Sequence, residues 1–190
     1  MPDLQLAFDP EADALLSRDP FALLLGMLLD QQMPMERAFG GPARLLERIG
    51  GDRLDPAVIA SWDPQEFAAL MSRPPAVHRY PGSMAARVQA LAAAIVDDYG
   101  GATEVLWESA SSGGELVSRL EALPGFGEMK ARIFAALLGK QRGVRPRGWR
   151  SACAPYGEAR STRSAADVTD KASLLAVRAF KQQQKAAARR

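Results

Sequence analysis

The sequence predicts an all-α fold, and three observations support this prediction. Apolar residues recur at spacings of three and four over most of the 190 residues, as they do along one face of an α-helix. Start and stop signals such as Asp19-Pro20 and Gly50-Gly51 bound these segments. The alternation of apolar and polar residues that is typical of strands is scarce, and the segment before Pro10 is the one weak strand candidate.

The first helix that we expect is also the most apolar. Asp19 suits the N-cap and Pro20 the first turn, and residues 21–29 are apolar on every side, so this helix is expected to be central. Further helices are expected, in chain order, at Met35–Ile49, Asp55–Ser61, Pro64–Met71 and Met84–Tyr99, with Gly50-Gly51 and Gly100-Gly101 as stops.

Two amphipathic helices then flank a short loop. Residues 115–123 place leucines on one face, and Pro124 ends this helix because proline lacks an N–H donor. A second helix is expected from Glu128, with Gly139 as a natural C-cap. The pattern then breaks down over residues 143–167, before a last helix at Lys171–Ala188.

The loop Leu123-Pro124-Gly125-Phe126-Gly127 is the most informative stretch. Gly125 and Gly127 permit positive φ angles and allow a ligand to approach the backbone closely. Their N–H groups and those of the next helix's first turn are expected to face outward, where the helix dipole favours an anion such as a DNA phosphate. The alternative is an ordinary turn between two helices, in which Pro and Gly only interrupt the helical structure.

The charge distribution favours a polyanionic ligand. Residues 1–139 carry 11 Lys/Arg and 19 Asp/Glu, a balance of −8, whereas residues 140–190 carry 13 and 3, a balance of +10. Cations that neutralise phosphates release condensed counterions and so strengthen binding. For residues 181–190, a basic tail that only promotes solubility is the alternative.

Length and composition limit the remaining possibilities. A chain of 190 residues with 47% hydrophobic content can form one domain or two small lobes. Because the N-terminus lacks a signal-peptide layout and no apolar run approaches about 18 residues, we expect a soluble cytoplasmic protein without a membrane partner. Cys153 is the only cysteine, which excludes an internal disulfide and a four-cysteine iron–sulfur cluster. We expect no metal and no cofactor.

Three segments, in this order, resemble the helix–hairpin–helix DNA glycosylase superfamily, which includes endonuclease III-like and adenine-mismatch glycosylases: Leu28–Gln32, Pro81–Val88 and Leu123–Gly127. The resemblance spans roughly residues 18–145. It implies a two-lobed helix–hairpin–helix fold, in which duplex DNA binds between the lobes and a damaged base is flipped out and released. We expect one globular unit of two interleaved lobes over residues 1–190, with the basic segment 143–190 packed on it and a flexible end from about residue 182.

The resemblance also implies DNA-contacting residues. Family members insert a polar residue into the space left by the flipped base, and Gln32, with Gln31 beside it, occupies that place. Both glutamines have a structural alternative as caps of the preceding helix. The hairpin residues Gly125, Phe126, Gly127 and Lys130 and the downstream Arg145 and Arg147 are further candidates.

The usual catalytic residues are missing from their expected positions. Bifunctional relatives carry a lysine nucleophile where this chain has Met129, and Lys130 points about 100° away around the helix, so we expect no Schiff-base mechanism. The family's aspartate is absent from residues 143–149. Asp167 and Asp30 are the candidates to stabilise the cationic sugar, with Glu158 a third, although the aspartates have the alternative roles of helix capping and ion pairing.

Aromatic and basic side chains complete the candidate site. His78, Arg79 and Tyr80 form a loop that suits contact with a phosphate or base, although packing is the simpler role for His78. Trp149 and Tyr156 are candidates for the walls of a pocket for the flipped base, and Trp149 has the alternative role of a packing anchor.

The resulting prediction is a monomeric, monofunctional DNA glycosylase of base excision repair, acting on damaged or mismatched bases in duplex DNA and associated with the nucleoid. The alternatives are a non-catalytic DNA-binding protein with the same fold, and a helical protein-interaction domain whose basic tail is incidental.

Overall fold

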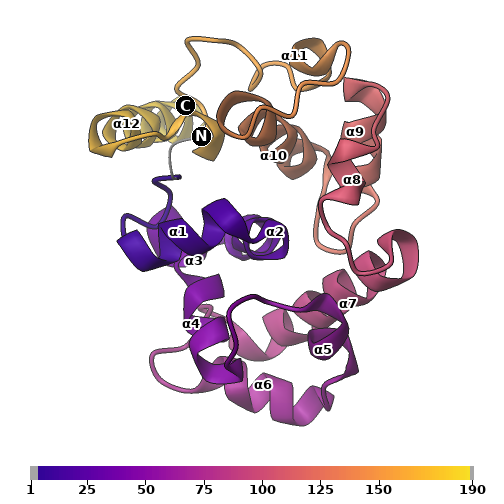
Figure 1. Ribbon diagram of the computed structural model, residues 1–190. Coiled ribbons are helices and arrows are strands. Elements are labelled where there is room, and N and C mark those ends of the chain that lie inside the picture. Colours follow the sequence, from indigo (N-terminus) through magenta and orange to yellow (C-terminus); the bar gives the residue numbers. More distant parts are fainter. Residues whose placement is uncertain (1–3, 189–190) are drawn as a thin grey trace. The chain divides into compact units, whose positions relative to one another are not determined.

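The structure, a computed structural model, describes residues 4–188, and every regular element in that range is a helix (Figure 1). The all-α prediction is therefore confirmed. An isolated bridge pairs Ser112 with Arg147. The elements are α1 Pro10–Arg18, α2 Pro20–Leu29, α3 Met35–Phe39, α4 Gly41–Ile49, α5 Pro56–Ser61, α6 Pro64–Ser72, α7 Pro81–Tyr99, α8 Val105–Glu108, α9 Gly113–Glu121, α10 Glu128–Gln141, α11 Trp149–Ala152, the 3₁₀ helix η1 Ala165–Asp167, and α12 Lys171–Ala187.

The chain divides into two compact units that alternate along the sequence. Unit 1 contains Ala110–Glu121 and Gly127–Arg190, and unit 2 contains Pro2–Ser109 and Ala122–Phe126. Residues Leu123–Phe126 of the hairpin loop are thus part of unit 2, whereas Gly127 and the helices on either side of the loop, α9 and α10, belong to unit 1.

Unit 2 is built around α2. All residues from Phe21 to Leu29 are buried, as predicted from their apolar character on every side. Asp19 caps the helix by accepting a hydrogen bond from Ala22 N at 3.1 Å, and its second oxygen accepts one from Leu54 N at 2.7 Å. The same carboxylate therefore starts α2 and holds the segment before α5 against it.

The remaining helices of unit 2 end where the sequence indicates. Gly50 and Gly100 have φ angles of +86° and +61°, as expected for glycines that stop helices. The helix predicted over residues 35–49 is interrupted at Gly40. Here the start of α4 passes close to α2, since a Cβ on Gly41 would lie 2.6 Å from Leu29 Cδ1.

The segment before Pro10 forms no strand. Asp13 in α1 accepts hydrogen bonds from Leu6 N and Ala7 N at 2.9 and 2.8 Å, so a side chain, and not a neighbouring strand, satisfies these backbone groups. Leu4 and Leu6 are buried, which explains the apolar pattern that suggested a strand.

In unit 1, α9 and α11 pack on α10, as does η1, and α12 packs on η1. Gly139 does not cap α10 as predicted, because the helix continues to Gln141. This position requires glycine for a different reason: the ring of Trp149 would lie 2.4 Å from a Cβ on Gly139. Within residues 4–188, no helix is long and apolar enough to cross a membrane.

Candidate nucleic-acid interface

The hairpin loop combines buried apolar side chains with exposed glycines. Leu123 and Phe126 are buried, and Phe126 N donates a hydrogen bond to Leu123 O at 3.1 Å, which closes the turn. Gly125 and Gly127 are exposed. Phe126 therefore anchors the loop through its ring, while the backbone at both glycines is accessible to a ligand.

The two glycines have different conformations. Gly125 has a φ of +81°, in the left-handed region that favours glycine. Gly127 is the N-cap of α10 and has an extended backbone with a φ of −106°, so the positive φ that glycine permits is not adopted at this position. No heavy atom lies within 4 Å of a Cβ built on Gly127, which leaves its surroundings open.

The start of α10 presents amide donors. Among residues 4–188, the N–H groups of Gly125, Gly127 and Met129 have no hydrogen-bond acceptor, and Ala131 N is the first to donate into the helix, to Gly127 O at 2.9 Å. Unpaired amides at a helix N-terminus favour an anion. The side chain of Met129 is 65% exposed beside them, and Lys130 is half-buried.

The hairpin loop lies against the end of α2. A Cβ on Gly125 would approach Leu28 Cδ1 to 2.4 Å, so only glycine allows this contact. Leu28 is followed after two residues by the glutamine pair, and all of these residues belong to unit 2. The fold therefore brings together two of the segments that carry the family resemblance, although about 90 residues separate them in the sequence.

The two glutamines after α2 have distinct environments. Gln31 caps the helix, since its Nε2 donates to Leu28 O at 2.9 Å and its Oε1 accepts from Arg87 Nη1 at 3.1 Å. Gln32 is exposed, and its φ of +54° is uncommon for a residue with a side chain. The capping role that we considered for both residues thus fits Gln31 and leaves the side chain of Gln32 available.

His78 supports this loop from inside unit 2. It is 2% exposed; its Nδ1 accepts a hydrogen bond from Tyr80 N at 3.1 Å, and its Nε2 lies 3.0 Å from Gln31 O. An accepting Nδ1 assigns the proton to Nε2, which then donates to Gln31 O. His78 therefore positions the backbone of Gln31. Its neighbours Arg79 and Tyr80 are exposed, with the guanidinium 5.4 Å from the centre of the tyrosine ring.

Asp30 is the C-cap of α2 and is half-buried at the base of the same loop. The other aspartate candidate, Asp167, lies in unit 1, where its side chain is only 2% exposed. Its Oδ1 pairs with Lys140 Nζ, and its Oδ2 accepts from Ser161 Oγ, Arg163 N and Ser164 N at 3.1, 2.9 and 3.1 Å. With both oxygens engaged, Asp167 has the structural role of capping η1 and pairing with Lys140.

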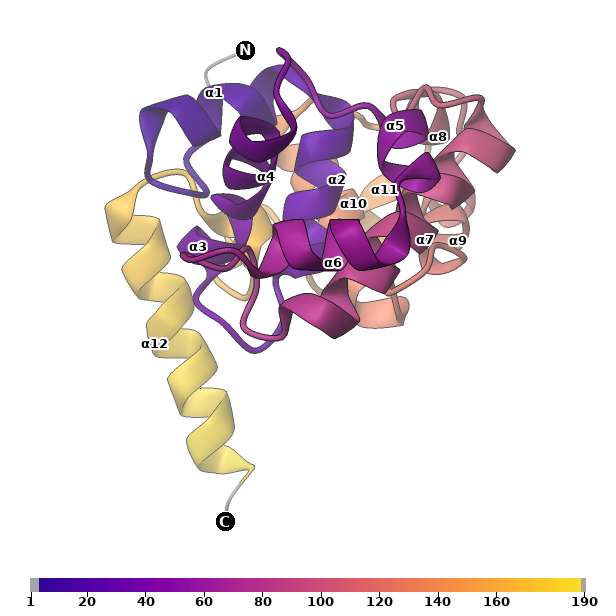
Figure 2. The same cartoon turned by 90° about the horizontal axis from the view of Figure 1, so that it is seen from below.

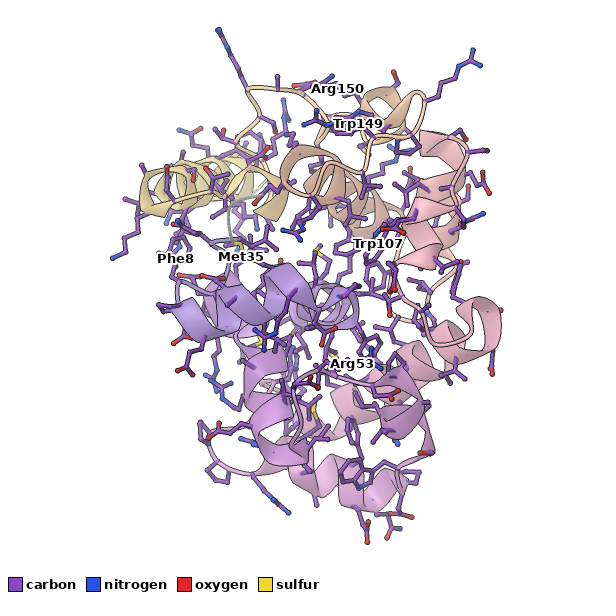
Figure 3. All side chains as sticks on the ribbon, viewed as in Figure 1. Phe8, Met35, Arg53, Trp107, Trp149 and Arg150 are labelled. Carbon is purple, nitrogen blue, oxygen red and sulfur yellow. The ribbon has the colours of Figure 1, made fainter. Side chains whose placement is uncertain are left out.

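The aromatic candidates of unit 1 differ in exposure. Trp149 is 7% exposed and packs on Gly139, with the Arg150 guanidinium 4.8 Å from its ring centre (Figure 3). This is the arrangement of a packing anchor.

The remaining candidates of unit 1 are more accessible. Tyr156 is half-buried, and Glu158 and the downstream arginines Arg145 and Arg147 are exposed. Arg145 Nε donates to Gly139 O at 2.9 Å, near the C-terminal end of α10.

Sequence reasoning missed two residues that organise these segments. Arg87 holds the side chain of Gln31, and Lys140 neutralises Asp167. Arg87 is the only cation of α7, and this isolated charge on an otherwise apolar and acidic helix was an available signal. Nothing in the spacing of Lys140 and Asp167, 27 residues apart, indicates their pairing.

A family model for the HhH-GPD superfamily of base excision DNA repair proteins matches residues 25–190. The match covers most of the chain, which therefore belongs to this superfamily. The resemblance predicted from the Leu28–Gln32, Pro81–Val88 and Leu123–Gly127 segments is confirmed. No curated protein and no solved structure matches the chain.

Proposed function

We propose that this base excision repair protein is a monofunctional DNA glycosylase, which releases a damaged or mismatched base from duplex DNA by hydrolysis. The observation that carries the proposal is the contact of Gly125 with Leu28. It places the exposed backbone of Gly125 close to the end of α2, which the loop of Asp30, Gln31 and Gln32 follows directly within the same unit.

In this proposal the hairpin holds one DNA strand through its backbone. The free amides of Gly125, Gly127 and Met129 donate to phosphate oxygens, a contact that positions the duplex without reading its sequence. Gln32 enters the base stack, where its amide group donates to and accepts from the unpaired base opposite the lesion. Gln31, tied to Leu28 and Arg87, fixes the base of the loop from which Gln32 projects.

In this proposal Asp30 supplies the carboxylate that stabilises the sugar during base release. Cleavage of an N-glycosidic bond develops positive charge on the sugar, which a nearby carboxylate stabilises. A water molecule then attacks C1′ and transfers its proton to the carboxylate, while the base leaves with the bonding electron pair and takes up a proton. Met129 offers no amine for a covalent intermediate, so hydrolysis is the expected outcome.

The test is base release from a panel of duplexes that carry uracil, alkylated, deaminated or oxidised bases, with strand cleavage by alkali as the readout of abasic sites. The proposal expects release from at least one duplex, a loss of roughly a hundredfold or more in Asp30→Asn, and no loss in Asp52→Asn, an exposed carboxylate of the same unit. Gln32→Ala is expected to weaken processing of the duplex without unfolding the protein. Equal activity of Asp30→Asn and the wild type would remove Asp30 from the mechanism.

The second candidate function is that of a non-catalytic DNA-binding protein. It is favoured by the engagement of both oxygens of Asp167, a candidate to replace the family's missing aspartate, and by the methionine at position 129, where the family's bifunctional members carry a lysine. Tight duplex binding without base release from any member of the panel would support this function and contradict the glycosylase proposal.

A further inference from the structure

Helix α12, Lys171–Ala187, has an unusual charge pattern. It contains four cations, Lys171, Arg178, Lys181 and Lys185, and no acidic residue, while Asp170 immediately before it is occupied as the N-cap. The Asp170 side chain accepts from Ser173 N at 2.7 Å. The helix therefore presents a positive potential over its whole length, with no acid of its own to neutralise it.

The four cations lie on one side of the helix. At about 100° per residue, their positions fall within an arc of roughly 80°. We call this set of four side chains the α12 basic stripe. The helix is attached through its first half, where Leu174 and Val177 are buried, and every residue from Lys181 to Ala188 is exposed. Figure 2 shows the C-terminal half of α12 running clear of α10 and α11.

Unit 1 fixes the start of α12 at one end of α10. Gln141 Nε2 donates to Ala166 O and Val168 O at 3.0 and 3.1 Å, and Lys140 pairs with Asp167, so η1 is attached to the last turn of α10. The Arg163 guanidinium lies 5.1 Å from the ring centre of Phe180 and braces α12 from the side. Because α10 has 14 residues, it separates η1 from the hairpin end by roughly 20 Å.

We propose that the α12 basic stripe is a second phosphate-binding surface, which contacts the backbone of the same DNA duplex outside the part that the hairpin holds. This inference rests on the proposed binding of duplex DNA. A spacing of roughly 20 Å corresponds to about six base pairs. The stripe provides cations on flexible side chains, which suit contacts with phosphate oxygens, and such contacts position a duplex without reading its sequence.

The test uses full-length protein and duplexes with a central tetrahydrofuran abasic-site analogue, one of about 10 and one of about 30 base pairs, because only the longer one extends past the hairpin contact. The variant is the triple substitution Lys171→Gln, Lys181→Gln and Lys185→Gln, which keeps a similar helix propensity. The matched control keeps the charge by substituting arginine at the same three positions. Arg53→Gln controls for loss of a cation elsewhere, since Arg53 lines a cavity of unit 2 together with Asp52, Glu104 and Glu108.

On the long duplex, the glutamine variant is expected to bind more weakly, and the slope of log affinity against log salt is expected to become shallower by up to about 2.7. On the short duplex, both quantities are expected to match those of the wild type. The arginine variant and Arg53→Gln are expected to behave as the wild type on both duplexes. Circular dichroism of each variant verifies that the helix is retained.

An unchanged slope and affinity on the long duplex would overturn the inference, as would equal losses on both duplexes. Failure of the proposed function is distinguishable from these results. Absence of base release combined with a shallower slope contradicts the glycosylase proposal and supports DNA binding by the α12 basic stripe. Base release combined with an unchanged slope contradicts only DNA binding by the stripe.

Discussion

Gly125 and Gly127 are two residues apart, and the structure gives them different roles. Gly125 combines a positive φ with a close approach to Leu28, so its requirement for glycine comes from the fold. Gly127 has an ordinary extended backbone and open surroundings, so its lack of a side chain matters for what approaches from outside. Substitution at the two positions therefore separates stability from binding.

We expect Gly125→Ala to destabilise the protein by about 1–3 kcal/mol, because the new methyl group meets Leu28 Cδ1 and the left-handed conformation disfavours alanine. Gly127→Ala is expected to cost less than about 1 kcal/mol, the loss of a favourable N-cap, and to weaken duplex binding. Urea denaturation and fluorescence anisotropy at one salt concentration measure the two effects. Unchanged duplex affinity of Gly127→Ala would contradict the role assigned to the hairpin backbone.

Met129 permits a gain-of-function test at the residue scale. Its side chain is exposed at the second position of α10, where the bifunctional relatives that the hairpin resembles carry a lysine. A lysine placed here would lie beside the positive end of the helix dipole, which lowers the pKa of an ammonium group and so favours the free amine.

On a duplex that the wild type processes, we expect Met129→Lys to form a Schiff base with the sugar that borohydride traps as a covalent complex. The wild type and Glu128→Lys, whose side chain lies about 100° away on the helix, are expected to give none. Gel electrophoresis after reduction detects the complex. Trapping by the wild type would contradict the monofunctional mechanism.

At the scale of elements, the buried Lys140–Asp167 pair attaches η1, and with it α12, to α10. The side chains are 15% and 2% exposed, so removal of one partner leaves a poorly solvated charge. We expect Asp167→Asn to destabilise the protein by about 3 kcal/mol. We expect the double variant Lys140→Met with Asp167→Asn to be less destabilised than the sum of its single substitutions, as urea denaturation of the four proteins would show. Additive losses would indicate that the pair is not coupled.

Cys153 follows α11 and is fully buried, and burial raises the pKa of its thiol to about 11, against the opposing influence of Lys140 and Arg132. In the unfolded chain the thiol ionises near its ordinary value of 9.0, so the unfolded state loses the proton first and stability decreases as the pH rises from about 9 to 11. At pH 10.5 this amounts to about 2 kcal/mol. Cys153→Ala is expected to lack this component, which denaturation at pH 8 and 10.5 would measure; an identical pH dependence in both proteins would contradict the assignment.

Short sequence motifs correctly predicted those helices whose position and ends depend on neighbouring residues alone. The Asp19-Pro20 pair, the all-apolar residues 21–29 and the Gly50-Gly51 stop each specify their element within a few residues, and the structure confirms all three. Gly139 was assigned wrongly because its role depends on Trp149, a partner ten residues further along the chain. For Asp167 the sequence left a catalytic and a capping role open, and the pairing with Lys140 becomes visible only in the folded structure. The candidate site depends on such distant contacts, and its composition was therefore harder to predict than the helices.

At the scale of the whole molecule, charge follows the division into units. Unit 1 contains 16 Lys/Arg and 6 Asp/Glu residues and unit 2 contains 8 and 16, which gives net charges of +10 and −8 within an overall charge of only +2. At long range, the net charge of unit 1 therefore attracts a polyanion and that of unit 2 opposes its approach, so the contacts proposed for Gly125 and Gln32 of unit 2 depend on short-range hydrogen bonds. This asymmetry selects which surfaces can bind a phosphate backbone before any specific contact forms.

A pair of charge reversals tests this polarity. Arg147 is exposed in unit 1, and Arg53 is exposed in unit 2 beside acidic residues. Because phosphates near Arg147 interact with a positive surrounding, we expect Arg147→Glu to reduce duplex affinity by roughly tenfold at low salt, with the loss shrinking as salt screens the charges. Arg53→Glu is expected to change affinity by less than about twofold, although it alters the net charge by the same amount. Equal losses for the two reversals would mean that only the total charge of the protein matters, and that duplex DNA has no preference for the surface of unit 1.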